Sequence, residues 1–412
     1  MLLRKDSSSY CVFLAQYLKY PPESTIVHIE KKLYMLLSLI FLTSLLMAAF
    51  SIPSIINLAF KKRLFDNPSE IRKVHKRIVP NFGGIAIFTS FLFSCSLFIK
   101  SDLVPQSNVL MAGGLILFMT GLKDDIIGLG PLVKLVAQII SGTIIAVVAD
   151  IRIDDLHGFL GVGALDYYSS VILTTAFIVS IVNAFNLIDG IDGLAASLGV
   201  TLSLIYTYLF WNAGEIGWSY LSIALTGSLI GFMFYNVTPA RIFMGDCGSL
   251  LLGFIAVVLS IKFIDISSHH HVVFGSVEIE SSMGLTLSIL IIPIFDTIRV
   301  FTLRILRNTS PFKADNNHLH HRLLFLGLSH MQSTLVLVVT NVLFIVMALS
   351  LQNLDNTQLI SVLVLTVLAL NGGLSLYIES FRRSLLAKAH APEKPVIVKS
   401  FGEEILEKIT EN

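Results

Sequence analysis

The stretch Val171–Trp211, VILTTAFIVSIVNAFNLIDGIDGLAASLGVTLSLIYTYLFW, consists of two long apolar runs joined by a short turn that carries Asp189 and Asp192 among glycines. Each run is close to the roughly 20 apolar residues that a helix needs to cross a bilayer. Unpaired backbone groups are very costly in hydrocarbon, so these runs are predicted as helices and not strands. The two carboxylates at their junction therefore lie at the edge of a membrane segment.

The whole chain shares this apolar character. Of its 412 residues, 54% are hydrophobic and only 14% are charged, and the mean hydropathy is +0.78. A soluble domain carries roughly 25% charged residues, so the lipid bilayer must be the solvent for much of this chain. The net charge of +1 argues against a nucleic-acid binder, which needs a basic face.

The fold class is predicted to be an all-α integral membrane protein. About eleven stretches have the length and apolarity of a spanning helix. They are 33–56, 82–99, 106–122, 131–149, 169–187, 193–211, 217–235, 247–264, 284–304, 333–351 and 357–378. The domains are then an N-terminal extension at 1–32, a membrane catalytic domain at 33–380 and a cytoplasmic tail at 381–412. The extension lacks the features of a signal peptide, and Met35 suggests that the true start lies downstream of residue 1.

The orientation follows from lysine and arginine, which concentrate in cytoplasmic loops. Basic segments come after the first, ninth and eleventh predicted helices, all on one side of the membrane. Lys31 and Lys32 lie on the other side, but the three later segments outweigh them. The N-terminus is therefore predicted outside and the C-terminus in the cytoplasm.

Four polar motifs follow odd-numbered helices and so share the cytoplasmic face. They are KDDIIGLGPLVK (123–134), NAFNLIDGIDGL (183–194), PARIFMGDCGSL (239–250) and FDTIRVFTLRILRNTSPFKADNNHLHHRL (295–323). Their carboxylates and amides suit a hard cation, Mg²⁺ or Mn²⁺. Their basic residues, among them Lys134 and Arg322, suit phosphate oxygens. The combination indicates phosphoryl transfer at the membrane surface.

Each motif alone has a plainer interpretation. Asp124 and Asp125 could form a solvated turn, and Asp189 and Asp192 could be turn formers. Asp246 could be simply the N-cap of a helix. The histidines at 318–321 could be a polar loop or a zinc set, although the chain has three distant cysteines and no CxxC. A functional site is favoured because all four motifs are predicted on the same face of the membrane.

At these residues the chain resembles the polyprenyl-phosphate N-acetylhexosamine-1-phosphate transferases, the bacterial WecA/TagO group, with MraY as a more distant relative. The resemblance covers roughly residues 35–380. It is carried by DDxxGLxxxxKLxxQ from Asp124 to Gln138, NxxNxxDGxDGL from Asn183, FMGDxGSL from Phe243, and SPFxxDxxHLHHRL from Ser310.

The resemblance implies transfer of a sugar-1-phosphate from a UDP-N-acetylhexosamine to undecaprenyl phosphate, with Mg²⁺ or Mn²⁺ as cofactor and UMP released. The HLHHRL form of the last motif implies UDP-N-acetylglucosamine and the first lipid-linked sugar of a surface polysaccharide such as an O-antigen. Another UDP-N-acetylhexosamine and phospho-N-acetylmuramoyl-pentapeptide stay open as donors. The implied location is the bacterial cytoplasmic (inner) membrane, with the active site on the cytoplasmic face, and a homodimer stays open.

The family's functional residues carry over by motif. Asp124, Asp125 and Asp246 are implied as catalytic, with Asp124 the proton acceptor, and Asp246 and Asn186 as metal ligands. The implied substrate-binding residues are Lys134, Asn183, Asp189, Asp192, His318, His320, His321, Arg322, Lys76 and Arg77. Direct attack by the lipid phosphate and a two-step route through an aspartyl-phosphate are both compatible with these motifs.

Two rivals belong to other classes. An ion-coupled transporter would place its acids at mid-membrane beside a matched pair of broken helices, whereas these acids are predicted at one surface. A catalytically silent scaffold has no need for intact acidic motifs.

Overall fold

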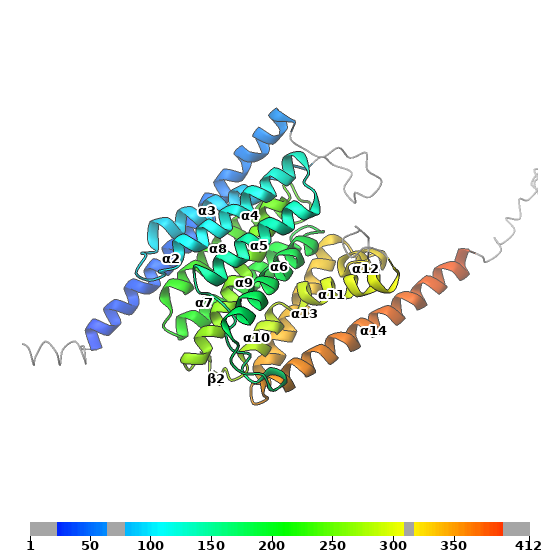
Figure 1. Ribbon diagram of the computed structural model, residues 1–412. Helices are drawn as coiled ribbons and strands as arrows, with labels where there is room; N and C mark the ends of the chain where they lie inside the picture. The colour runs from blue at the N-terminus through cyan, green and yellow to red at the C-terminus, as the bar shows by residue number, and fades with distance from the viewer. Residues whose placement is uncertain (1–22, 64–78, 309–316, 390–412) are drawn as a thin grey trace, which may run out of the picture. The chain divides into compact units, whose positions relative to one another are not determined.

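The computed structural model describes residues 23–63, 79–308 and 317–389 (Figure 1). Thirteen α-helices, one 3-10 turn and one two-stranded hairpin make up these residues. They are α2 (Glu23–Lys62), α3 (Gly83–Phe98), α4 (Ser107–Ile127), α5 (Pro131–Val147), η1 (Phe159–Gly161), α6 (Tyr167–Ile188), α7 (Leu194–Asn212), α8 (Ile216–Asn236), α9 (Gly245–His269), β1 (Val273–Phe274), β2 (Val277–Glu278), α10 (Ser282–Ile289), α11 (Ile291–Leu306), α12 (Leu319–Phe325), α13 (His330–Ser350) and α14 (Asn356–Ala389).

All eleven stretches predicted from apolarity are helical. Among the described residues, seven helices are long and apolar enough to cross a membrane, namely those containing Lys31–Lys62, Tyr167–Ile188, Leu194–Asn212, Ile216–Asn236, Gly245–His269, His330–Ser350 and Asn356–Leu386. Helices α3 and α5 are apolar but shorter. The protein is therefore an all-α membrane protein, while eleven crossings and an outside N-terminus remain predictions. Helix α2 begins at Glu23, inside the segment predicted as an extension.

The ninth predicted span, 284–304, is two helices and not one. Helix α10 ends at Ile289 and α11 begins at Ile291, because Pro293 has no N–H to donate to the Ile289 carbonyl four residues earlier. The side-chain amide of Asn341 in α13 donates instead to the carbonyls of Ser288 (2.9 Å) and Ile289 (3.3 Å). A neighbouring helix thus satisfies the polar groups that the break leaves exposed.

Helix α9 is the central element of the first unit, Met1–Leu365. It packs against α3, α4, α6, α7 and α10 and is buried along most of its length (Figure 1). The second unit begins at Thr366, and its described part is the rest of α14.

Two glycines let α3 and α4 approach the start of α9 backbone to backbone. A Cβ added to Gly84 would lie 2.2 Å from the Gly248 nitrogen, and one added to Gly121 would lie 2.5 Å from the Cys247 Cα. No larger residue fits at either position without displacing backbone. This close packing places the first turn of α9, which carries Asp246, directly against the end of α4.

Candidate active site

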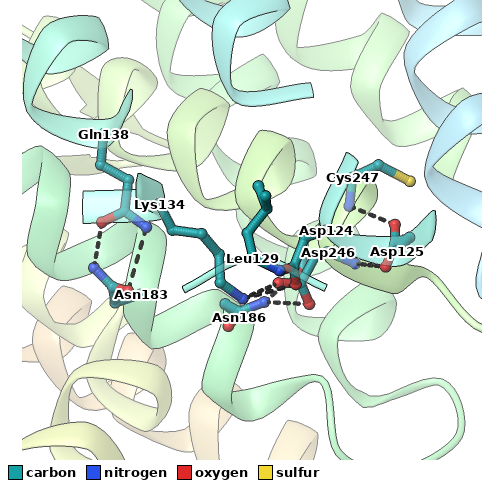
Figure 2. A network of polar contacts seen from close by, with 10 residues as sticks. Asp124, Asp125, Leu129, Lys134, Gln138, Asn183, Asn186, Asp246 and Cys247 are labelled. Atoms are coloured by element: carbon teal, nitrogen blue, oxygen red, sulfur yellow. Dashed lines mark hydrogen bonds and ion pairs between the residues drawn. The ribbon is translucent and has the colours of Figure 1, made fainter. Parts of the chain in front are cut away.

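The end of α4 caps the start of α9. The two carboxylate oxygens of Asp125 accept the backbone N–H groups of Asp246 (2.8 Å) and Cys247 (3.0 Å), as Figure 2 shows. The first N–H groups of a helix have no partner within the helix and carry its partial positive charge, so a carboxylate there is doubly favoured. Asp125 therefore holds the Asp246 segment in place.

Lys134 forms ion pairs with two further carboxylates, those of Asp124 and Asp246, and these residues form a cluster with Asp125. Its Nζ lies 2.8 Å from Asp124 Oδ2 and 2.6 Å from Asp246 Oδ2. Asp124 also accepts the Leu129 backbone N–H through its other oxygen, at 2.6 Å. Residues 124 and 134 lie on either side of the turn between α4 and α5, so this turn points a cation at the acid of α9 (Figure 2).

Asn186, near the end of α6, completes the cluster. Its Nδ2 donates to Asp246 Oδ1 (3.0 Å) and to Ser249 Oγ (2.9 Å). With its N–H groups directed at α9, the amide has its carbonyl oxygen left to accept or to bind a cation. The amide of Asn183, by contrast, is paired with Gln138 of α5 through bonds of 2.6 and 3.3 Å and joins two helices.

A polar cavity of about 230 Å³ opens beside this cluster. Its lining includes Asn81, Asp125, Asn186, Asp189, Asp246 and Ser249. Asp125, Asn186 and Asp246, which come from three separate motifs, thus meet at one place as predicted. Asn81 and Ser249 are additions, since neither carries a charge or a distinctive spacing that would single it out in the sequence.

Asp189 and Asp192 have different surroundings, although only two residues separate them. Asp189 lines the cavity, and burial, together with the negative charges of Asp246 and Asp125, raises its pKa to about 7. Asp192 is 4% exposed, and its Oδ2 accepts the backbone N–H of Ala240 at 3.2 Å. Its other oxygen lies 3.4 Å from His330 Nδ1. Asp192 thus ties the 189–193 turn to the loop before α9 and to α13.

The histidine segment, residues 317–321, lies against the same turn. A Cβ added to Gly190 would lie 2.3 Å from His320 Nε2, so the imidazole of His320 packs directly on this glycine. The His318 and His320 rings stack with centroids 5.6 Å apart, and the His321 ring is 4.3 Å from that of His320. Burial, with the neighbouring His321, lowers the pKa of His320 to about 3, which keeps this imidazole neutral at physiological pH.

The remaining predicted residues are placed as follows. Arg322 belongs to α12, the helix that His318 precedes. Lys76 and Arg77 lie outside the described residues. Asp296 and Arg299 of α11, which the sequence analysis did not select, contact the histidine segment. A charged pair inside the apolar stretch 284–304 was the available signal, because such groups in membrane helices are costly.

Known proteins are similar to this chain over most of its length. The signature described as glycosyl transferase family 4 matches residues 107–264. A Bacillus subtilis protein named probable undecaprenyl-phosphate N-acetylglucosaminyl 1-phosphate transferase is 35% identical over 322 residues, 76% of this chain and 84% of the relative. The chain belongs to this transferase family.

Two further relatives show the spread of the family. The Mycolicibacterium smegmatis decaprenyl-phosphate N-acetylglucosaminephosphotransferase is 32% identical over 73% of this chain and 78% of its own length. The Escherichia coli O157:H7 undecaprenyl-phosphate alpha-N-acetylglucosaminyl 1-phosphate transferase is 25% identical over 67% of this chain and 73% of its own length. The family signature ends at residue 264, so it does not reach the histidine segment of this transferase.

Proposed function

We propose that the protein transfers N-acetylglucosamine-1-phosphate from UDP-N-acetylglucosamine to undecaprenyl phosphate and releases UMP. The observation that carries the proposal is the convergence of Asp124, Lys134, Asn186 and Asp246 beside one polar cavity. The relatives' names support the transferred group. They differ in the polyprenyl phosphate, undecaprenyl in one and decaprenyl in another, so the acceptor's length is part of the proposal.

The donor set fits Mg²⁺ or Mn²⁺. Asp246 offers a carboxylate and Asn186 an amide oxygen, and such hard oxygen ligands suit these ions. The described residues contain no group of three His, Cys, Asp or Glu side chains arranged around one point, and Mg²⁺ does not need one. It usually takes one or two carboxylates and completes its shell with water and substrate phosphates. Bound there, the ion would supply charge neutralisation for the departing UMP.

The remaining roles in the reaction are assigned to the chain's own residues. Lys134, which lies between two carboxylates, is positioned to donate to the pyrophosphate. Asp124 is assigned to the lipid phosphate as proton acceptor, a modest task because a phosphate monoester has a second pKa near 6. The neutral His320 can donate a hydrogen bond without adding charge, and Arg322 supplies a permanent cation for the phosphates.

Direct attack by the lipid phosphate on the β-phosphorus is favoured over an aspartyl-phosphate intermediate. Both oxygens of Asp125 accept backbone N–H groups. Asp124 and Asp246 share the Lys134 ammonium, which lowers the nucleophilicity of both. Inversion of configuration at a chiral, isotopically labelled β-phosphorus would support direct attack, and retention would support the covalent route.

The reaction is assigned to the cytoplasmic face of the bacterial inner membrane. The support is the distribution of basic loops in the sequence, all of which follow odd-numbered predicted helices, together with membership in a family of bacterial membrane enzymes.

Purified full-length protein, radiolabelled UDP-N-acetylglucosamine, undecaprenyl phosphate and Mg²⁺ test the function. Lipid-extractable label should form, disappear with EDTA and return with excess Mg²⁺ or Mn²⁺. An Asp246→Asn variant should form none. Label from UDP-N-acetylgalactosamine alone would reassign the sugar, and no lipid-linked label from any UDP-N-acetylhexosamine would refute the reaction.

A further inference from the structure

A buried acid of α11 forms hydrogen bonds to its own helix and to the histidine segment. Asp296 is 1% exposed. Its Oδ2 lies 2.8 Å from His318 Nδ1, and its Oδ1 accepts the backbone N–H of Leu319 at 2.9 Å. Arg299, one turn further along α11, donates to the same Oδ1 at 3.0 Å and to the carbonyl of Asn317. One carboxylate and one guanidinium thus clamp residues 317–319.

The clamp determines which nitrogen of His318 carries a proton. A carboxylate only accepts hydrogen bonds, so the imidazole nitrogen that faces Asp296 must be the protonated one. In neutral His318 the lone pair is then on Nε2. Within the described residues Nε2 of His318 has no hydrogen-bonding partner. The same logic operates wherever a carboxylate orients a histidine through one nitrogen so that the other can act.

A chain of direct contacts connects the clamped His318 to the cavity. The His318 ring stacks on His320 at an interplanar angle of 6°, and His320 packs on Gly190, next to the cavity-lining Asp189. Any rotation of the His318 ring would therefore disturb the side of the cavity that the 189–190 turn forms.

We propose that Asp296 is a positioning residue of the transferase: it fixes the Nδ1–H tautomer and ring orientation of His318, and so presents His318 Nε2 as an acceptor to the sugar nucleotide. The proposal rests on the proposed function for the identity of that substrate. It adds a residue outside the cluster of Asp124, Asp125, Lys134, Asn186 and Asp246 to the set that supports the reaction.

Asp296→Asn is the informative substitution because it preserves shape. The asparagine Oδ1 still accepts from Leu319, so the start of α12 stays capped, but its NH₂ now faces His318 and can only donate. The imidazole must respond by moving its proton to Nε2. ¹⁵N spectra of histidine-labelled protein, with His318→Gln used to assign the signal, should show this tautomer change directly.

Kinetics provide the second readout. Asp296→Asn should lower kcat/KM for UDP-N-acetylglucosamine about 10–100-fold, the range found when a metal-ligating histidine loses its orienting carboxylate, with KM for undecaprenyl phosphate unchanged. In a His318→Gln background the same substitution should cause no further loss. Asp265→Asn is the matched control, because Asp265 also forms an i,i+3 pair, a half-buried one with Lys262 at 2.6 Å, near the end of α9 that lies opposite Asp246.

The outcomes separate the two proposals. Losses that multiply in the double variant, or a His318 that keeps its proton on Nδ1 in Asp296→Asn, would overturn the positioning role. If the wild-type protein transfers no sugar phosphate at all, the proposed function fails, and the ¹⁵N spectra still decide whether Asp296 sets the tautomer.

Discussion

At the scale of single residues, Lys134 links two acids that come from different helices, Asp124 of α4 and Asp246 of α9. Its ammonium lies within 2.8 Å of two carboxylates that would repel each other without it. The side chain therefore holds Asp124 and Asp246 together in the resting enzyme.

Lys134→Gln should reduce kcat/KM about 100–1,000-fold, the typical cost of losing a donor aimed at transition-state charge. Lys123→Gln is the control, because Lys123 is exposed and lies next to Asp124 near the end of α4. Steady-state transfer of labelled sugar phosphate measures both. Near wild-type activity in Lys134→Gln would remove Lys134 from the reaction.

Asp189 leads to a pH prediction. Its pKa is raised from 3.8 to about 7 in the folded protein, so between about pH 4 and 7 the folded state holds a proton that the unfolded chain has released. The stabilisation from this proton is complete below about pH 4 and is lost as the pH rises through 7.

In EDTA, the melting temperature of the wild type should therefore fall between pH 5 and 8 more steeply than that of Asp189→Asn. The variant should be the more stable protein at pH 8. Parallel pH profiles of the two proteins would show that Asp189 titrates at its ordinary pKa.

At the scale of helices, the active site depends on how closely α3 and α4 approach α9. Gly84→Ala introduces a methyl 2.2 Å from the Gly248 nitrogen, so the backbone of α9 must move. Overpacking of this kind costs about 1–3 kcal/mol, and here it also displaces Asp246 from Asp125 and Lys134.

Thermal unfolding and transfer activity should both decline in Gly84→Ala. Gly142→Ala is the control, because its added methyl would meet Ile178 and Thr175 at an ordinary 3.4 Å. An active, fully stable Gly84→Ala protein would show that the contact between α3 and α9 can accommodate an additional methyl group.

At the scale of the whole molecule, the open question is which side of the membrane holds the cavity. Cysteine substitutions can answer it, because Cys95 and Cys247 are buried and Cys11 can be replaced by serine. Lys123→Cys should react with a membrane-impermeant maleimide only in inverted vesicles. Asp154→Cys, in the loop between α5 and α6, should react only in intact spheroplasts. The reverse pattern would place the active site outside.

Much of the architecture could be predicted because a bilayer leaves the chain few options. Apolar stretches of about 20 residues must be helical to satisfy their backbone groups, and all eleven are. The break between α10 and α11 was missed, because Pro293 alone does not reveal that Asn341, some fifty residues later, would satisfy the freed carbonyls.

The candidate site, too, could be predicted from the sequence only in part. The motifs identified most of the acids and bases, since charged groups among apolar helices stand out. They did not distinguish Asp189, which lines the cavity, from the buried Asp192, nor reveal that Asp125 caps a helix 121 residues away. Asp296 was passed over because its partners come from a segment 22 and 23 residues further along the chain.

Apolarity and short-range motifs by themselves predicted a helical membrane protein with phosphoryl-transfer chemistry, because the cost of unpaired polar groups in lipid and the chemistry of acids beside phosphates depend on residue type and local spacing. The phosphosugar transferase type was implied by the family resemblance that those motifs carry. Only the tertiary structure decided which carboxylates face the cavity, which cap helices and which orient a histidine. Those roles arise from contacts between distant segments, where packing fixes the direction of each side chain.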